Sequence, residues 1–287
     1  MTKEQIMQEA AALQEEIKSH RLWLHTHAET GFDLTETKPY VKSALTEMGY
    51  AVHECGKAGL VTTVGKPGGK VLLLRADMDA LPIAEEADVD FACKNGRMHA
   101  CGHDMHTAML LGAAKILKAH ESELDGMVKL MFQPAEESSP IGGARPIVES
   151  GFLEAQRIDA LYGLHNWPSL PVGEIGVKPG AIMAASDRFH IEIIGRTAHA
   201  AEPHLGVDAI MIASKIDCAL VQDLRHEVDP FDPISVSIGA FSTEGRYNIV
   251  CEHAALDGTV RSTHEGTREY LHRRIHEIAE GIARTYG

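Results

Sequence analysis

Four short segments of this sequence gather residues that bind metals or carry protons. Each segment follows a strand or opens a helix among the elements that the pattern of apolar residues predicts. Open α/β sheets place their active sites at the carboxyl ends of their strands, so we expect the four segments to meet at one edge of a sheet. They are RADMD (75–79), HACGHDMH (99–106), QPAEE (133–137) and HNWP (165–168).

The second and fourth segments offer sulfur and nitrogen ligands. Cys101 and His103 stand at the start of a predicted helix, where the helix dipole favours the thiolate that binds metal. His165 follows a predicted strand and is expected to join them. The simpler alternatives are a small buried cysteine and a histidine that only covers the end of the sheet. His99 and His106 fit equally well as groups that support the ligands or as ordinary polar residues.

Paired carboxylates in the first and third segments add oxygen ligands and a base. Glu136 and Glu137 follow a predicted buried strand, and burying two adjacent carboxylates is costly unless a cation is present. Since neighbouring side chains diverge, one can bind metal while the other deprotonates a water; the alternative is a solvated loop. Asp77 and Asp79 alternate along an extended segment, so they point the same way, and one of them is placed to orient a ligand histidine.

The combination of one cysteine, two histidines and a glutamate selects a class of metal. It suits Zn²⁺ and other borderline divalent ions better than Mg²⁺ or Ca²⁺. Carboxylates beside several histidines also allow two metal ions close together, which activate water and polarise a carbonyl. Other enzyme signatures are absent, since the sequence contains no G-x-S-x-G, no Walker loop, no H-E-x-x-H and no P-C-x-x-C.

Alternating strands and helices are expected to position these segments. The patterns predict strands over 60–64, 71–74, 128–132 and 160–164, and helices over 6–24, 36–48, 102–118 and 144–149. This alternation indicates an α/β domain with a largely parallel central sheet. After residues 173–180 the pattern changes. We predict strands over 188–194, 234–241 and 249–261 and helices over 207–224 and 265–286, which together form a second, α+β unit.

The composition restricts the partners and the location. The 287 residues include 27 Lys and Arg against 41 Asp and Glu, so the net charge of −14 disfavours nucleic acid and anionic membranes as partners. No apolar run reaches the length of a membrane span, and the N-terminus lacks the pattern of a secretory signal. The five cysteines are widely spaced and predict no disulfide framework. We therefore expect a cytoplasmic protein.

The same motifs resemble those of the M20 metallopeptidase family. The resemblance is carried by RADMDALPI (75–83), MHACGHDMHTA (98–108), FQPAEE (132–137) and GLHNWP (163–168), and it continues through 195–210, 248–262 and the final helix. The match is to the amidohydrolase branch, which includes hippurate hydrolases, N-acyl-amino-acid amidohydrolases and auxin-conjugate hydrolases. It implies a catalytic α/β domain over 1–177 and an inserted α+β lid over 178–287, through which two chains form a homodimer.

The resemblance also implies roles for single residues. It implies a centre of two divalent metal ions (Zn, Mn, Co or Ni), whose ligands match Cys101, His103, Glu137 and His165. Glu136 matches the general base.

Four further positions match groups around the metals. Asp79 matches the aspartate that orients the metal site. In the lid, His199 matches the histidine that stabilises the oxyanion, often in the neighbouring subunit's site. Asn248 and Arg261 match positions near the substrate carboxylate, which an arginine can bind through two hydrogen bonds.

The activity that this resemblance implies is the hydrolysis of a small N-acyl amino acid to a carboxylic acid and a free amino acid. A metallo-dipeptidase or deacetylase of the same family is one alternative. The other is a non-catalytic, dimerising remnant, because the family places a further ligand histidine near its C-terminus and this sequence stops at Gly287. On that ground we expect the chain to be the N-terminal portion of a longer protein, with an incomplete catalytic domain.

Overall fold

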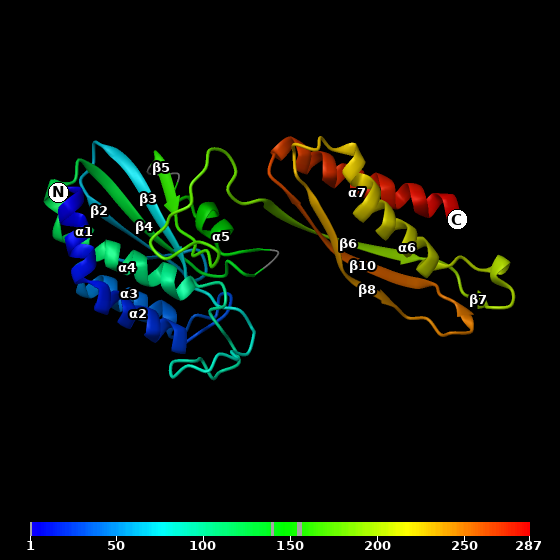
Figure 1. The fold of residues 1–287 in the computed structure, drawn as a ribbon, viewed down its shortest axis with the longest axis horizontal. Helices are drawn as coiled ribbons and strands as arrows, with labels where there is room; N and C mark the ends of the chain where they lie inside the picture. Colours follow the sequence, from blue (N-terminus) through cyan, green and yellow to red (C-terminus); the bar gives the residue numbers. More distant parts are fainter. Residues whose placement is uncertain (1, 139–140, 154–156) are drawn as a thin grey trace. The chain divides into compact units, whose positions relative to one another are not determined.

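The computed structural model describes residues 2–138, 141–153 and 157–287 (Figure 1). Within it the chain divides into two units, Met1–Pro171 and Val172–Gly287, each with its own core. The boundary that we expect at 177/178 and the catalytic and lid roles of the two parts stay predictions.

A five-stranded sheet forms the centre of the first unit. Its order is β1-β2-β4-β3-β5, in which β3 pairs in parallel with both β4 and β5, while β2 pairs antiparallel with β4 and β1. Only β2 therefore runs against the other strands, and the predicted, mainly parallel sheet is confirmed. The strands are β1 His53–Cys55, β2 Gly59–Gly65, β3 Lys70–Asp77, β4 Gly126–Gln133 and β5 Ala160–Gly163. The sequence pattern did not predict β1.

Helices cover both faces of this sheet because side chains of the central strand β4 alternate between the faces. Phe132 packs into a core with α2, α3 and α4, whereas the neighbouring Met131 packs on the other face against α5. The helices are α1 Lys3–Ala12, α2 Gln14–Thr26, α3 Thr37–Glu47, α4 His103–Ala119 and α5 Ala144–Glu149.

The first predicted helix, 6–24, is divided in the structure. The break between α1 and α2 falls at Leu13, whose backbone (φ −88°, ψ 0°) leaves the helical conformation. A single-residue break leaves the spacing of apolar residues almost unchanged, so periodicity alone does not reveal it.

The second unit is an antiparallel sheet with two helices packed on it. The sheet has the order β6-β10-β8, and its core joins Leu256 of β10 to Ile212 of α6 and Leu271 of α7. The predicted strand over 249–261 is interrupted after Val250, so its first two residues form β9 and pair with β7 instead. The elements are β6 Ala185–Ile194, β7 Ala198–His199, α6 Ala209–Cys218, β8 Ser235–Thr243, β9 Ile249–Val250, β10 His253–Ser262 and α7 Glu265–Tyr286. No helix among the described residues is both long and apolar enough to cross a membrane.

The packing of α4 predicts a stability difference between two residues on that helix. Leu111 is completely buried, whereas Met109 is 39% exposed. Leu111→Ala should lower the free energy of unfolding by about 3 kcal/mol, and Met109→Ala by less than about 1 kcal/mol. Chemical denaturation followed by tryptophan fluorescence measures this difference, because Trp23 and Trp167 both lie in the first unit. Equal losses for the two variants would contradict the packing described here.

Candidate metal centre

The first unit brings two ligand-bearing segments together at the start of α4. His103 is the first residue of α4, and the preceding Gly102 has a φ of +86°, a left-handed conformation that glycine adopts without strain. His165 follows β5, the strand that pairs in parallel with β3. Its Nε2 atom lies 3.3 Å from Sγ of Cys101. Sulfur and nitrogen atoms that could bind metal, from distant parts of the sequence, therefore lie close together.

Four predicted site residues surround one buried nitrogen atom, Nε2 of His103. The ligand atoms of Cys101, His103 and His165 lie within 4.8 Å of one another, and so do those of His103, Glu136 and Glu137. Nε2 is 3.6 Å from the carboxylate of Asp77 and 3.9 Å from those of both glutamates, and it has no hydrogen-bond partner among the described residues. A buried, unpaired nitrogen facing two carboxylates fits a divalent cation, which would satisfy all three groups.

Asp79 determines how these groups face one another. Its main-chain carbonyl accepts a hydrogen bond from Nδ1 of His103 at 2.8 Å, which leaves Nε2 as the free nitrogen. Its carboxylate accepts the main-chain N–H of Glu136 at 2.8 Å and of Glu137 at 3.1 Å. One completely buried residue thus orients a nitrogen ligand and both glutamates.

The crowded carboxylates shift the pKa values of the cluster. Burial, and then the neighbouring Glu137, raises the pKa of Glu136. Burial alone would lower the pKa of His103, but Asp79 and the other carboxylates outweigh it and raise that pKa. Burial, followed by Glu137, raises the pKa of the Cys101 thiol to about 12. We expected the helix N-terminus to favour the thiolate of Cys101. In the protein without metal this expectation is wrong, because burial and nearby negative charge outweigh the helix dipole.

The buried carboxylate of Asp77 lies beside the cluster and is held through both of its oxygens. One oxygen of Asp77 accepts a hydrogen bond from Nδ1 of His106 at 2.6 Å, and the other is 2.5 Å from the Arg75 guanidinium. Burial would raise the pKa of Asp77, but His106 and Arg75 outweigh it and lower the pKa to about 2. The ligand atoms of Asp77, His103 and His106 also lie within 4.8 Å of one another, but both oxygens of Asp77 are already engaged by His106 and Arg75.

A buried ionic network, which the sequence pattern did not predict, lies behind the start of α4. Asp104 is 2.9 Å from Nε of Arg21 and 2.8 Å from Nδ1 of His25, whose other ring nitrogen is 3.0 Å from Glu85. The available signal was the i, i+4 spacing of Arg21 and His25, which places both on one face of a helix. His99 lies close by, buried with no hydrogen-bond partner in the described parts of the chain, and burial lowers its pKa to about 4.

The second unit brings two of its three predicted site residues together. His199 ends β7, and the N–H of the next residue, Ala200, donates to the carbonyl of Asn248 at 3.1 Å. Arg261 stands near the far end of β10, which starts at His253. Ten extended residues span roughly 30 Å, so Arg261 lies at the opposite end of this strand from the other two within one copy of the unit.

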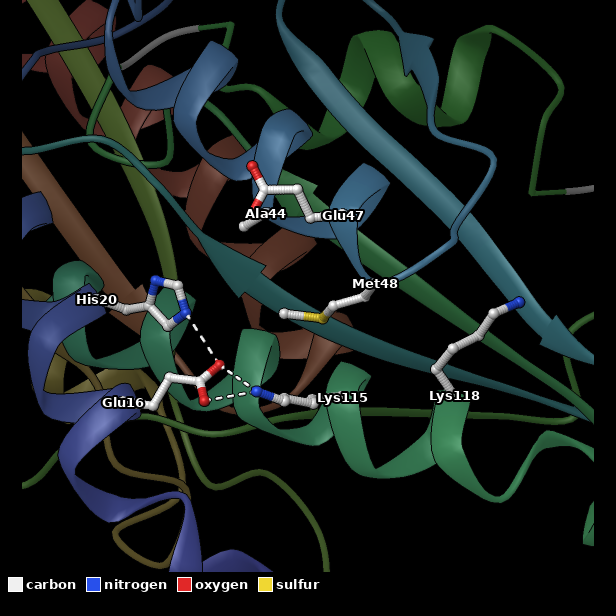
Figure 2. A pocket seen from close by; sticks show the side chains of 7 residues that line it. All are labelled: Glu16, His20, Ala44, Glu47, Met48, Lys115 and Lys118. Carbon is white, nitrogen blue, oxygen red and sulfur yellow. Dashed lines mark hydrogen bonds and ion pairs between the residues drawn. The ribbon is translucent and has the colours of Figure 1, made fainter.

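A separate pocket of about 360 Å³ opens among α2, α3 and α4 (Figure 2). Lys115 pairs with Glu16 at 2.6 Å, and Lys118 pairs with Glu121 at 2.7 Å. Lys115 lies about 18 Å along α4 from His103, at 1.5 Å per residue. The pocket is therefore remote from the cluster, and its charges largely neutralise one another. Its lining consists of Glu16, His20, Ala44, Glu47, Met48, Lys115 and Lys118.

This chain is similar in sequence to a known protein family and to several known proteins. A model of peptidase family M20/M25/M40 matches residues 73–282, more than half of the sequence. An N-acyl-L-amino acid amidohydrolase of Geobacillus stearothermophilus is 37% identical over 290 residues, which cover 100% of this chain and 78% of the relative. An N-acetyl-L-cysteine deacetylase of Bacillus subtilis is 38% identical over 279 residues, which cover 96% of this chain and 66% of the relative.

Structure comparison gives the same result. A dinuclear metal-binding peptidase of the M20 family from Bacillus subtilis superimposes with a TM-score of 0.80 and 36% sequence identity. The match covers 96% of this chain and 72% of that structure. The chain therefore spans about two thirds to four fifths of the length of these relatives.

The ionic network behind α4 predicts a pH dependence of stability. The hydrogen bond to Asp104 raises the pKa of His25 above its ordinary value, and the hydrogen bond to Glu85 adds to this effect. Burial and the nearby Arg21 act in the opposite direction but are outweighed. His25 therefore stabilises the fold fully below about pH 6.5 and loses that contribution as the pH rises through its raised pKa. The loss of unfolding free energy caused by His25→Gln should accordingly be larger at about pH 5.5 than at about pH 9.

Chemical denaturation at both pH values measures this difference. The control is His53→Gln, which makes the same change at an exposed position on β1. A loss for His25→Gln that stays constant or grows with pH would show that protonated His25 does not stabilise the network.

Proposed function

This chain belongs to peptidase family M20/M25/M40, and from that premise we propose that it hydrolyses the amide bond of N-acyl amino acids at a dinuclear metal centre. One observation carries the proposal. Cys101, His165 and two glutamates converge on the buried and unpaired Nε2 of His103. Without a cation, this arrangement would leave a buried acceptor facing two repelling carboxylates, which is costly.

The donor set fits the metal that the family implies. Cys101, His103, Glu137 and His165 would hold it, and this mixture of sulfur, nitrogen and oxygen suits Zn, Mn, Co or Ni. A divalent cation bound there would polarise the substrate carbonyl and increase the acidity of water. The relative whose structure binds two metal ions supports a dinuclear centre.

Glu136 is the group that we propose as general base. Its side chain is 41% exposed, against 24% for Glu137, so it is the more accessible of the two carboxylates. Its raised pKa brings it closer to the range in which a carboxylate both accepts and returns a proton. Glu136 would take a proton from the attacking water, whose oxygen bonds to the amide carbon. The proton then moves to the leaving nitrogen as the C–N bond breaks.

The placement of residues in the second unit supports a homodimer. We propose that His199 stabilises the oxyanion, and that Asn248 and Arg261 bind the substrate carboxylate. Within one copy of the unit, Arg261 lies at the opposite end of β10 from His199 and Asn248. A site that contains all three would therefore combine residues from two copies. Loss of one oxyanion donor typically costs about 3 kcal/mol of activation free energy, so His199→Ala should strongly reduce turnover.

The substrate class rests on relatives that act on N-acyl-L-amino acids and on N-acetyl-L-cysteine. A panel of N-acetyl, N-benzoyl and indole-acetyl amino acids together with dipeptides would separate an amidohydrolase from a deacetylase or a dipeptidase. Metal content measured beside turnover would separate all three from the non-catalytic alternative. The cytoplasmic location and the exclusion of nucleic acid as a partner stay predictions.

The role of Glu136 predicts a separation of metal binding from turnover. Glu136→Gln should keep its metal content but lose hydrolysis by about 10²-fold or more, because the amide cannot accept the proton. Elemental analysis and release of free amino acid measure the two properties. Glu86→Gln makes the same change at an exposed position and should match the unmodified protein in both. Undiminished turnover in Glu136→Gln would remove Glu136 from this role.

The metal requirement predicts reversible inactivation. A strong chelator should abolish the release of amino acid, and adding back Zn, Mn, Co or Ni should restore it, because the four ligands belong to the folded chain. Circular dichroism of the chelated protein shows whether the fold persists. Elemental analysis shows whether all metal has been removed. Full turnover in such metal-free protein would contradict the proposed mechanism.

A further inference from the structure

We propose that His106 and Asn166 form a clamp that holds two ligand-bearing segments of the metal centre at a fixed separation. This inference rests on the proposed function, since it concerns the ligands of that centre. The His106–Asn166 clamp would make both residues positioning residues, neither of which binds metal or substrate. The two segments are the start of α4, with Cys101 and His103, and the stretch after β5, with His165.

The stretch after β5 needs such a clamp because little else fixes it. β5 is an edge strand of four residues, and three of them are exposed. His165 is anchored within the stretch itself, through a 2.7 Å hydrogen bond from Nδ1 to the carbonyl of Asn166. This bond leaves Nε2 of His165 free as a ligand atom, but it fixes the ring only relative to Asn166. The position of that nitrogen therefore depends on where the backbone of Asn166 is held.

His106 holds that backbone. The N–H of Asn166 donates to Nε2 of His106 at 3.0 Å, and Oδ1 of the Asn166 side-chain amide lies 2.7 Å from the same nitrogen. Because a backbone N–H can only donate, Nε2 accepts, and the proton of the ring is on Nδ1. An Nε2 that accepts cannot also donate to Oδ1, so the oxygen and nitrogen of the Asn166 amide would exchange places and turn the NH₂ group toward the ring.

The other side of the ring is tied to the sheet. Nδ1 of His106 donates to Asp77 at 2.6 Å, and the guanidinium of Arg75 holds the second oxygen of Asp77. Arg75 in turn donates from Nε to Gln133 at 2.9 Å. A continuous set of hydrogen bonds therefore runs from the ends of β3 and β4 through α4 to the ligand-bearing stretch.

Asn166 also touches the backbone between the other two ligands. A Cβ atom on Gly102 would lie 2.3 to 2.7 Å from the amide of Asn166, so this amide packs directly on Gly102. Gly102 stands between Cys101 and His103 in the sequence. The clamp thus contacts both segments at positions next to their ligands, and the 3.3 Å approach of Cys101 to His165 depends on it. A side chain that only filled space would not need this directional bonding.

The experiment measures metal binding by three variants of the purified protein. The dissociation constants for Zn²⁺ and Co²⁺ are obtained by competition with a chromophoric chelator, and the absorption spectrum of bound Co²⁺ reports the ligand geometry. Asn166→Ala leaves the buried Asp77–His106 pair intact, so it should fold, and it should weaken binding about 10-fold. His106→Leu should weaken binding up to about 100-fold. His106→Gln, whose amide can still accept from Asn166 and donate to Asp77, should restore part of the loss.

Asn95→Ala is the matched control, because it makes the same change in the same unit at an asparagine whose side chain donates to the main-chain carbonyl of Ala28 instead of contacting His106. It should bind metal like the unmodified protein. A purely structural role for Asn166 would lower the thermal stability of metal-free protein by as much as Asn95→Ala does, with unchanged metal affinity and an unchanged cobalt spectrum. That result would overturn the clamp while the proposed function stands. Failure of the unmodified protein to bind metal would overturn both.

Discussion

The hydrogen bond from Nδ1 of His103 to the main-chain carbonyl of Asp79 is the contact on which the site depends. It leaves Nε2 as the free nitrogen, in a buried position that faces Glu136 and Glu137. The carboxylate of Asp79 meanwhile holds the main-chain N–H groups of those same glutamates. Asp79 therefore joins the end of β3, the start of α4 and the end of β4 at one point. This point lies at the carboxyl ends of the parallel strands β3 and β4, where open α/β sheets place their binding sites.

The surrounding charges show why the fold tolerates such a site. Asp77 and Asp104 flank the cluster in buried positions, but each is compensated, by Arg75 with His106 and by Arg21 with His25 respectively. Glu136 and Glu137 lie 3.9 Å from Nε2 of His103, too far for a hydrogen bond, and burial and then Glu137 raise the pKa of Glu136. The fold thus neutralises its supporting carboxylates internally and leaves the central ones to a cation. Holding two carboxylates close together without a compensating cation is costly, which supports the proposal that this cluster binds metal.

The sequence pattern predicted the chemistry better than the packing that supports it. The rule that sites lie at the carboxyl ends of strands and the starts of helices grouped Cys101 with His165 correctly in space, because Cys101 precedes α4 and His165 follows β5. The pairing of Asp104 with Arg21 and His25 depends on how α2 packs against α4, which periodicity does not specify. The order of the sheet, in which β4 lies between β2 and β3, was likewise not evident from the sequence, where β2 and β3 follow each other directly. The separation of Asn248 from Arg261, in contrast, was already implied by the extended strand predicted between them.

Above all, we propose that Cys101 and the histidines of two distant segments bind one metal centre. X-ray absorption spectroscopy of the zinc-loaded protein tests this most directly, because sulfur and nitrogen ligands differ in distance. We predict a sulfur neighbour at about 2.3 Å beside nitrogen and oxygen neighbours at about 2.0 to 2.1 Å, with the sulfur signal lost in Cys101→Ser. A wild-type spectrum with nitrogen and oxygen neighbours alone, or a sulfur signal that persists in Cys101→Ser, would contradict the account.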